Sequence, residues 1–304
     1  MYDTIKAYYQ GELAEIELLP NKENFVPNID ASGDLRGYKA KFGNIYIFLN
    51  LYHKLSFEGS LSRFAFNENF STMTRAAAKD AIEEICNFCG IPPEKWIITR
   101  LDISTILPAT TKIEILQNVL GSATRLKRWT CGKSGIYWGN SQRQLVIYDK
   151  TLWAKETNTD LPEVLKGFDW IRAELRLQKN IGQQTKSNAS LSLLYDEEFY
   201  LRVCKLWKSH FLSIKKQSGG IFQKKTNTAK AALGQFIAML QCGDNELFER
   251  MVKQAASNCE KTIERSRFKQ TIKKYVENNS EPEEKKDAAF NSFQRQIKCI
   301  VASH

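Results

Sequence analysis

The sequence predicts an α+β fold, in which an antiparallel sheet flanked by helices is followed by a mainly helical C-terminal domain. Between about residues 40 and 180, several short segments alternate apolar and polar residues, as strands with one solvated face do. Beyond about Asn180, apolar residues recur at helical spacing and strand signals are few. We therefore expect a first domain over residues 1–185 and a helical domain, for DNA binding or oligomerisation, over residues 186–304.

The expected elements of the first domain follow from local composition. Gly43–Leu51 and Tyr52–Phe57 are rich in Ile, Tyr, Phe and Leu, which favours two strands. Ser71–Cys89 predicts a helix, which Ser71 or Thr72 can cap and which Gly90 ends. The remaining predicted elements are a short helix at Thr111–Leu120 and strands at Trp96–Ser104, Ala123–Thr130, Gly135–Trp138, Arg143–Tyr148 and Trp170–Gln178.

The C-terminal domain is expected to consist of helices joined by a lysine-rich loop at Lys215–Asn227. Helical spacing predicts Glu197–Phe211, Thr228–Leu240, Glu246–Ala256 and Lys261–Tyr275. Within them, Ala231–Gln241 and Glu246–Gln254 flank Gly243, which fits either a helix-turn-helix for duplex DNA or a packing hairpin.

The chain is basic, with 44 Lys and Arg against 34 Asp and Glu and a net charge of +10. Such a charge favours a polyanionic partner, nucleic acid or an anionic membrane surface. The longest apolar run, Gly43–Leu51, is too short to span a bilayer, and Met1–Thr4 lacks the features of a secretory signal. We therefore expect a cytoplasmic protein that does not associate with membranes.

The numbers of cysteine and histidine residues limit the kinds of metal site that this chain can form. Of seven cysteines, Cys86 and Cys89 form the one C-x-x-C pair, which fits half of a zinc or redox site or two core residues of a helix. No second such pair follows, so core residues are the expectation. With only three histidines, a metal site built from imidazoles is not expected.

Three predicted strands carry ionisable residues on one face. Strand parity places Arg100, Asp102 and Ser104, together with Ile98, on one side of Trp96–Ser104. The same parity groups Gln144, Val146, Tyr148 and Lys150 on the second strand, and Arg172, Glu174, Arg176 and Gln178 on the third. If these strands are neighbours, Asp102, Tyr148 and Glu174 converge; otherwise the residues are the solvated face of a sheet.

Cleavage of a phosphodiester by a tyrosine requires this combination of groups. A phenol with a pKa of about 10 needs a cation to favour its phenolate, and the phosphate needs its developing charge neutralised. Asp102 and Glu174 offer oxygen ligands suited to Mg²⁺ or Mn²⁺, and Lys150 lies two residues after Tyr148.

The chain resembles the gene II/gene X replication initiators of filamentous phages and, more loosely, the rolling-circle initiators of small plasmids. The resemblance covers about residues 40–180. It rests on the turn and Asn-containing loop at Glu58–Phe70, the R-[IL]-D strand at Thr99–Ser104, the Gly-x-Ser turn at Tyr137–Ser141, the Tyr-x-Lys strand at Leu145–Lys150 and the R-x-E-x-R strand at Ile171–Arg176.

The resemblance implies a Rep-like endonuclease of the HUH superfamily that nicks and rejoins DNA at an origin through a 5′-phosphotyrosyl intermediate. It implies Tyr148 as nucleophile, with Lys150 beside it, and Asp102 and Glu174 as ligands of a divalent metal. The superfamily's paired histidines are absent, since Asp102-Ile-Ser104 stands in the corresponding strand. The third ligand stays open among Asn67, Glu68, Asn69 and His53.

The expected partners are single-stranded and origin DNA, a host helicase or polymerase, and a second copy of the chain. Basic residues beside Trp129 suit a single strand or, equally, protect an edge strand. Trp138 suits either base stacking or the core. The residues expected to bind DNA phosphates are Arg100, Arg172, Arg176, Arg125, Lys127, Arg128 and Asn69. The alternative function is a non-catalytic protein that binds the origin or single-stranded DNA.

Overall fold

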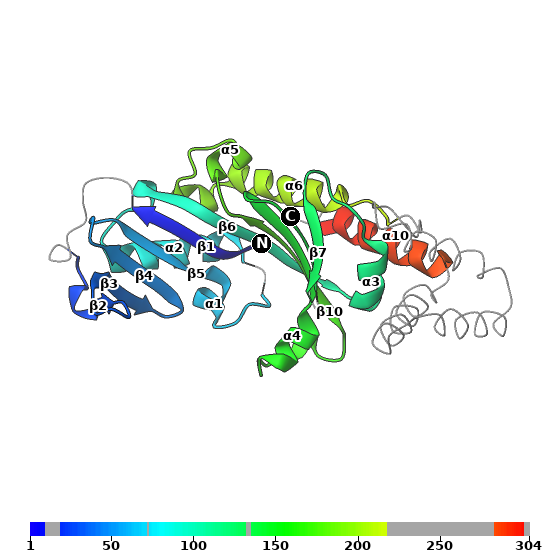
Figure 1. Cartoon of the computed structure of the whole chain (residues 1–304), viewed down its shortest axis with the longest axis horizontal. Helices are drawn as coiled ribbons and strands as arrows, with labels where there is room; N and C mark the ends of the chain where they lie inside the picture. Colours follow the sequence, from blue (N-terminus) through cyan, green and yellow to red (C-terminus); the bar gives the residue numbers. More distant parts are fainter. Residues whose placement is uncertain (10–18, 72, 132–134, 218–282, 301–304) are drawn as a thin grey trace, which may run out of the picture.

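The computed structural model describes residues 1–9, 19–71, 73–131, 135–217 and 283–300, and its described strands form one sheet (Figure 1). The strands are β1 (Tyr2–Tyr9), β2 (Val26–Ile29), β3 (Leu35–Phe42), β4 (Ile45–Asn50), β5 (Leu55–Ser60), β6 (Trp96–Pro108), β7 (Lys127–Cys131), β8 (Gly135–Gly139), β9 (Arg143–Asp149) and β10 (Trp170–Leu177). The α-helices are α1 (Leu61–Phe66), α2 (Arg75–Cys89), α3 (Ile113–Val119), α4 (Lys150–Glu156), α5 (Ile181–Thr185), α6 (Glu197–Leu212) and α10 (Glu283–Ile300). Short 3₁₀ helices lie at η2 (Lys22–Asn24), η3 (Pro93–Lys95), η4 (Glu163–Leu165) and η5 (Leu191–Tyr195).

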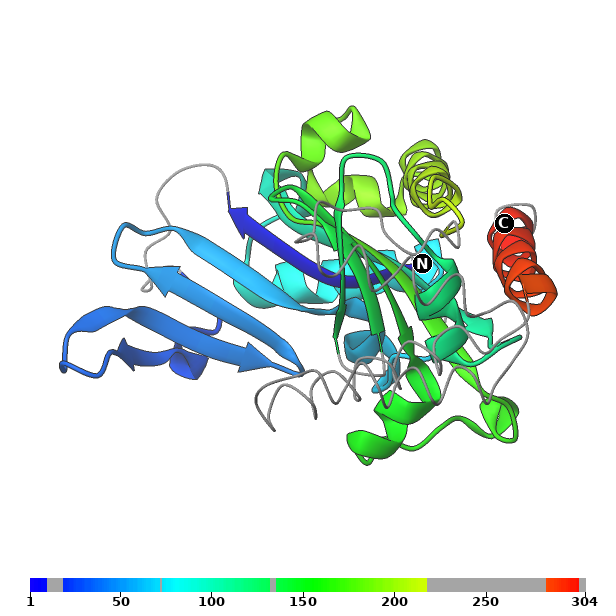
Figure 2. The same cartoon turned by 45° about the vertical axis from the view of Figure 1, so that its right-hand side comes forward.

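The ten described strands follow the order β2-β3-β4-β5-β1-β6-β10-β9-β8-β7, and every pair in it is antiparallel. The N-terminal strand β1 lies in the middle, between the hairpins β2–β5 and the strands β6–β10 (Figure 2). The predicted α+β class with an antiparallel sheet is therefore confirmed. The second predicted strand begins and ends three residues later than expected, as β5, because Leu51–His53 form the turn between β4 and β5.

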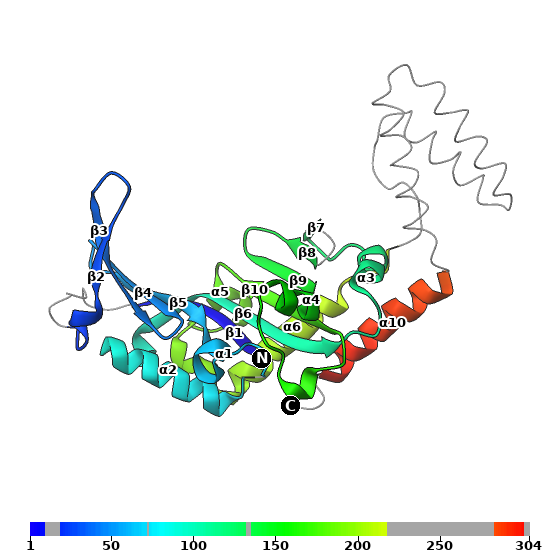
Figure 3. The ribbon, with the colours of Figure 1, turned by 90° about the horizontal axis from the view of Figure 1, so that it is seen from below.

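One face of the sheet is apolar and is covered by helices. Helices α2 and α6 run along the same side of the strands (Figure 3), and their buried residues share one core with Leu101, Leu145 and Leu175. The opposite face carries the ionisable residues of β6, β9 and β10. This division follows from the period-two alternation of the strands.

A bulge in β6 overturns one predicted orientation. Lys6 pairs with Arg100 but Ala7 pairs with Ile98, so the register between β1 and β6 shifts there. The extra residue reverses the alternation, as β-bulges do. Ile98 therefore lies buried on the apolar face with Leu101, and its predicted place beside Arg100 is wrong.

Helix α2 begins later than its composition indicated. The hydroxyl of Thr74, rather than Ser71 or Thr72, accepts a hydrogen bond from the Ala77 amide and caps the helix. Gly90 ends α2 in the left-handed conformation, with φ of 68°, as its position predicted. Cys86 and Cys89 lie buried on the inner face of α2, and burial raises the pKa of the Cys89 thiol to about 12, which confirms them as core residues.

The core of the sheet domain extends past residue 185. Helix α6 packs on β6 and β10, and the indole of Trp207, which is fully buried, donates a hydrogen bond to the Ala173 carbonyl at 3.3 Å. Phe293 and Ile297 of α10 are also buried in this core. The predicted helices from Thr228 to Tyr275, the helix-turn-helix candidate and most of the lysine-rich loop lie outside the described residues.

We expect Trp207→Ala to lower the free energy of unfolding of the whole sheet domain by about 3–5 kcal/mol, because it empties a large site in the shared core. Urea unfolding followed by circular dichroism measures this loss. Lys205→Ala, at an exposed position of the same helix, should change the free energy by less than about 0.5 kcal/mol. A similarly small effect of Trp207→Ala would show that α6 is not part of this core.

Within the described residues, none of the helices combines the length and apolar character needed to cross a membrane.

Candidate active site

Strand pairing brings the three predicted strands together in the order β6-β10-β9. Tyr148 pairs with Arg172, and Glu174 pairs with Val146 on one side and Ser104 on the other. Arg176 pairs with Asp102. Because residues paired across antiparallel strands share a face, Asp102, Tyr148 and Glu174 project from the same side of the sheet. We call this side the site face.

Asp102 and Glu174 form a buried acid pair. Both are almost inaccessible, at 0% and 3% exposed, and a hydrogen bond links their side chains. Burial raises the pKa of Asp102 to about 7, although the Arg100 guanidinium binds its carboxylate at 2.7 and 3.0 Å. Burial also opposes charge on Glu174, but the Arg176 guanidinium at 2.8 Å, together with Arg172 and the hydrogen bond with Asp102, outweighs it and leaves the pKa of Glu174 below its usual value. Near neutral pH Asp102 is therefore partly protonated, whereas Glu174 is ionised.

Arg172 joins three strands beside Tyr148. Its guanidinium, 3% exposed, binds Asp3 of β1 at 2.6 Å and donates hydrogen bonds to the Ser104 hydroxyl and the Asn69 carbonyl. Through these contacts Arg172 connects β1, β6 and the loop before α2. Because Arg172 is buried, a phosphate is more accessible to Arg100 and Arg176, whose side chains are 30% and 27% exposed.

The Tyr148 phenol is half-buried at the end of β9. Burial raises the pKa of Tyr148 above its usual range, and the nearby positive charge of Arg172 offsets only part of this effect. The phenol is thus protonated at neutral pH in the protein alone.

Lys150 does not extend the strand face as predicted. Strand β9 ends at Asp149, whose carboxylate accepts a hydrogen bond from the Leu152 amide and caps α4, so Lys150 is the first residue of that helix. Its ammonium group is buried 3.5 Å from the ring centroid of Trp153 and donates to the Asn69 side-chain oxygen at 2.8 Å. The predicted shared strand face is wrong, but Lys150 still borders the site, because Arg172 and Asp3 both affect its charge.

Burial lowers the pKa of Lys150 to about 7 from an ordinary value of 10.5. Between these values the unfolded chain binds a proton that the folded protein lacks, so stability should rise with pH in this window and stay flat below it. We expect the free energy of unfolding, relative to Lys150→Met, to increase on the order of 3 kcal/mol from pH 7 to pH 10. Urea unfolding of both proteins at each pH measures this; parallel curves would contradict a lowered pKa of Lys150 in the folded protein.

The four residues that the sequence offered as a third metal ligand lie in the loop before α2, at the end of α1 or in the turn between β4 and β5. Asn69 bridges Lys150 and Arg172, and the Glu68 carboxylate accepts hydrogen bonds from the Phe70 and Ser71 amides. Asn67 ends α1 in an exposed, left-handed conformation, and His53 lies in the exposed turn between β4 and β5. Across the described ranges, no group of three or more His, Cys, Asp or Glu residues is arranged to hold a metal.

The basic residues near Trp129 are Arg125, Lys127 and Arg128, and the last two lie on opposite faces of the edge strand β7. Lys127 pairs with Gly139, in the row that leads to Gln144, Arg176 and Asp102, and is therefore on the site face. Arg128 points the other way and donates to the Gln117 and Leu120 carbonyls, which anchors β7 to α3. Arg125 is exposed in the preceding turn.

Two residues of the site had no counterpart in the sequence prediction. Asp3 holds Arg172, and Glu58 binds Arg100 at 3.0 Å. Asp3 stands out only as an acid in the otherwise alternating segment Tyr2–Tyr9, and its role depends on the long-range pairing of β1 with β6. Trp138, in contrast, is a core residue whose indole donates to the Gly121 carbonyl at 2.7 Å.

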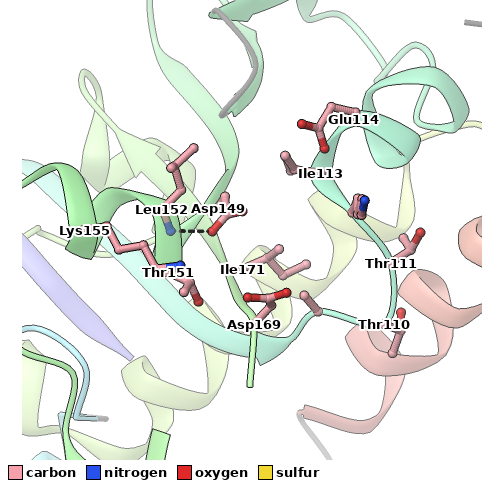
Figure 4. A pocket seen from close by; sticks show the side chains of 12 residues that line it. Thr110, Thr111, Ile113, Glu114, Asp149, Thr151, Leu152, Lys155, Asp169 and Ile171 are labelled. Carbon is pink, nitrogen blue, oxygen red and sulfur yellow. Dashed lines mark hydrogen bonds between the residues drawn. The ribbon is translucent and has the colours of Figure 1, made fainter. Parts of the chain in front are cut away.

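A cavity of about 480 Å³ lies on the opposite side of β9 and β10 (Figure 4). Asp149 and Ile171 line it, and they pair one position away from Tyr148 and Arg172, so they face away from the site. Glu114 and Asp169 also line it, but Asp149 is engaged in capping α4 (Figure 4). This cavity is therefore separate from the acid pair.

Comparison with known protein families shows to which family the chain belongs. The model of a phage family, the N-terminal region of the gene II-type replication-associated protein, matches residues 50–209, just over half of the 304 residues. The chain belongs to this family. Membership confirms the resemblance to filamentous-phage gene II initiators and supports a role in rolling-circle DNA replication. The matched region of the initiator contains Asp102, Tyr148 and Glu174; no curated protein sequence matched the chain.

Proposed function

We propose that this initiator nicks and rejoins single-stranded DNA with the Tyr148 hydroxyl as nucleophile. The observation that carries the proposal is the convergence of Tyr148, Asp102 and Glu174 on one face of three adjacent strands, among three arginines. A merely solvated face would not bury two hydrogen-bonded acids at 0% and 3% exposure. Buried, perturbed acids of this kind are typical of functional sites.

The proposed reaction exchanges one phosphodiester for another. The phenolic oxygen of Tyr148 loses its proton and attacks the phosphorus, and the bond to the 3′ oxygen breaks. The 5′ phosphate becomes joined to Tyr148, and the 3′ oxygen takes up a proton to give a free hydroxyl that can prime synthesis. Reversal of the same step rejoins the strand.

The acid pair fits a divalent cation by its donor set. Asp102 and Glu174 offer hard oxygen ligands, and a bound cation would offset the repulsion between their two carboxylates, which contributes to the raised pKa of Asp102. Bound there, Mg²⁺ or Mn²⁺ supplies charge neutralisation at the phosphate. The described residues offer no third acid or histidine grouped with this pair, so any further ligands from this part of the chain would be hydroxyl or amide oxygens, completed by phosphate or water oxygens.

The arginines of the site have separate tasks in this proposal. Arg172, opposite Tyr148, favours the phenolate and fixes Asp3 and Ser104. Arg100 and Arg176 hold the acids in place and keep exposed edges that can contact a phosphate. Lys150 positions the Asn69 loop over Arg172.

The test is incubation with labelled single-stranded origin DNA, with Mn²⁺ or with a chelator. We expect cleavage that requires the cation and leaves protein attached to the 5′ side of the break. The alternative, an initiator that binds the origin without cutting it, predicts a retained complex with intact DNA under both conditions.

A further inference from the structure

Two aromatic rings lie stacked on the site face, beside the acid pair. Trp129 of β7 and Tyr137 of β8 are cross-strand partners, with ring centroids 5.6 Å apart and planes inclined by 13°. Tyr137 pairs in turn with Val146, and Val146 with Glu174. The stack therefore continues the row of residues that contains Glu174, on the side from which Tyr148 projects.

The Trp129 side of the stack is open to solvent, whereas Tyr137 is half-buried. Trp129 lies on the edge strand and is 38% exposed. The rows on either side have glycine on β8: Gly135 pairs with Tyr148, and Gly139 pairs with Lys127. A Cβ at Gly139 would lie 2.9 Å from Cη2 of the Trp129 indole, so the ring can take this position only because residue 139 has no side chain. At Gly135 a Cβ would likewise lie 3.0 Å from the Tyr137 ring, so the two rings of the stack occupy the space that side chains at these glycines would fill.

The charges around the stack select the kind of occupant. Lys127 is exposed in the neighbouring row of the site face, which continues to Arg176, and the whole chain carries a net charge of +10. The acid of the stack's own row, Glu174, is neutralised by Arg176. A flat ring flanked by cations suits a single strand, whose bases stack on aromatic residues while its phosphates contact basic ones.

We infer that the Trp129–Tyr137 stack binds an unpaired base of the DNA strand that Tyr148 cleaves. Trp129 lies two strands from β9, about 10 Å, and two residues along it, about 7 Å. A base on the stack therefore belongs to a nucleotide close to the scissile phosphate. This inference rests on the proposed function for its substrate, and it adds that the substrate must be unpaired beside the break.

The test compares binding of oligothymidylate with binding of an abasic oligonucleotide of the same length and charge, at one fixed salt concentration. Stacking contributes through bases alone, so the protein should bind oligothymidylate about 10- to 100-fold more tightly than the abasic strand. Trp129→Ala should remove most of this difference and leave abasic binding unchanged. Trp129→Phe should retain most of it.

Tyr52→Ala is the matched control, because Tyr52 is 83% exposed in the turn between β4 and β5, far from β7 in the sheet. It should preserve the preference for bases. If Trp129→Ala weakened the binding of both oligonucleotides equally, or weakened the binding of neither, the inference would be overturned. Since binding is measured without cleavage, that failure would leave nicking by Tyr148 untouched, and absence of nicking would leave the binding comparison intact.

Discussion

Tyr148→Phe should abolish nicking of supercoiled origin DNA and of single-stranded origin oligonucleotides. The substitution removes only the hydroxyl that forms the covalent bond, so we expect the cleavage rate to fall on the order of 10⁴-fold or more. The phenylalanine ring fills the same half-buried position at the end of β9, so binding of DNA should persist. Gel electrophoresis of the nicked and supercoiled forms measures the loss.

Tyr38→Phe provides the control, because Tyr38 is a half-buried tyrosine of β3 at the distant side of the sheet. Its nicking rate should match that of the unmodified protein. If Tyr148→Phe still cuts DNA and Tyr137→Phe does not, the nucleophile is Tyr137, and the assignment of Tyr148 is wrong.

Glu174→Gln should lower the cleavage rate by about 10²- to 10³-fold and shift the Mn²⁺ dependence to higher concentration. The substitution removes the negative charge that Arg176 stabilises and half of the acid pair, while it preserves the size of the side chain. Asp102→Asn should act in the same direction. Cleavage rates across a Mn²⁺ titration, with melting temperatures to verify folding, measure the effect.

Glu58→Gln tests whether any acid near the arginines would have the same effect. Glu58 also binds Arg100, but its side chain is 40% exposed and lies two strands from β6. We expect its Mn²⁺ dependence to remain as in the unmodified protein. A normal Mn²⁺ dependence of Glu174→Gln, in a folded protein, would show that the acid pair does not hold the metal.

The convergence of the site could be predicted from sequence because it depends on local alternation. In β10 every second residue from Arg172 to Arg176 is charged, which places Glu174 with Arg172 and Arg176, and the same period in β9 places Tyr148 with Gln144. The apolar residues that alternate with them lie on the opposite face of the sheet, which the helices bury. The predicted neighbourhood of the three strands is confirmed by their pairing.

The errors have physical causes that alternation does not reveal. The bulge near Arg100 depends on the register between β1 and β6, strands that lie about 90 residues apart in the chain, so Ile98 appeared to belong to the polar face. Lys150 could have extended strand β9 by one residue, but Asp149 caps α4, so Lys150 is instead the first residue of that helix. Asp3 joins the site only through the same long-range pairing.

The assignment of Tyr148 as the nucleophile is tested most directly by mass spectrometry of the protein after reaction with single-stranded origin DNA and Mn²⁺. We expect, after nuclease and protease digestion, one peptide that spans β9 and carries a 5′-linked nucleotide on Tyr148. A nucleotide on any other residue, or cleaved DNA with no protein attached, would contradict the assignment of Tyr148 as the nucleophile.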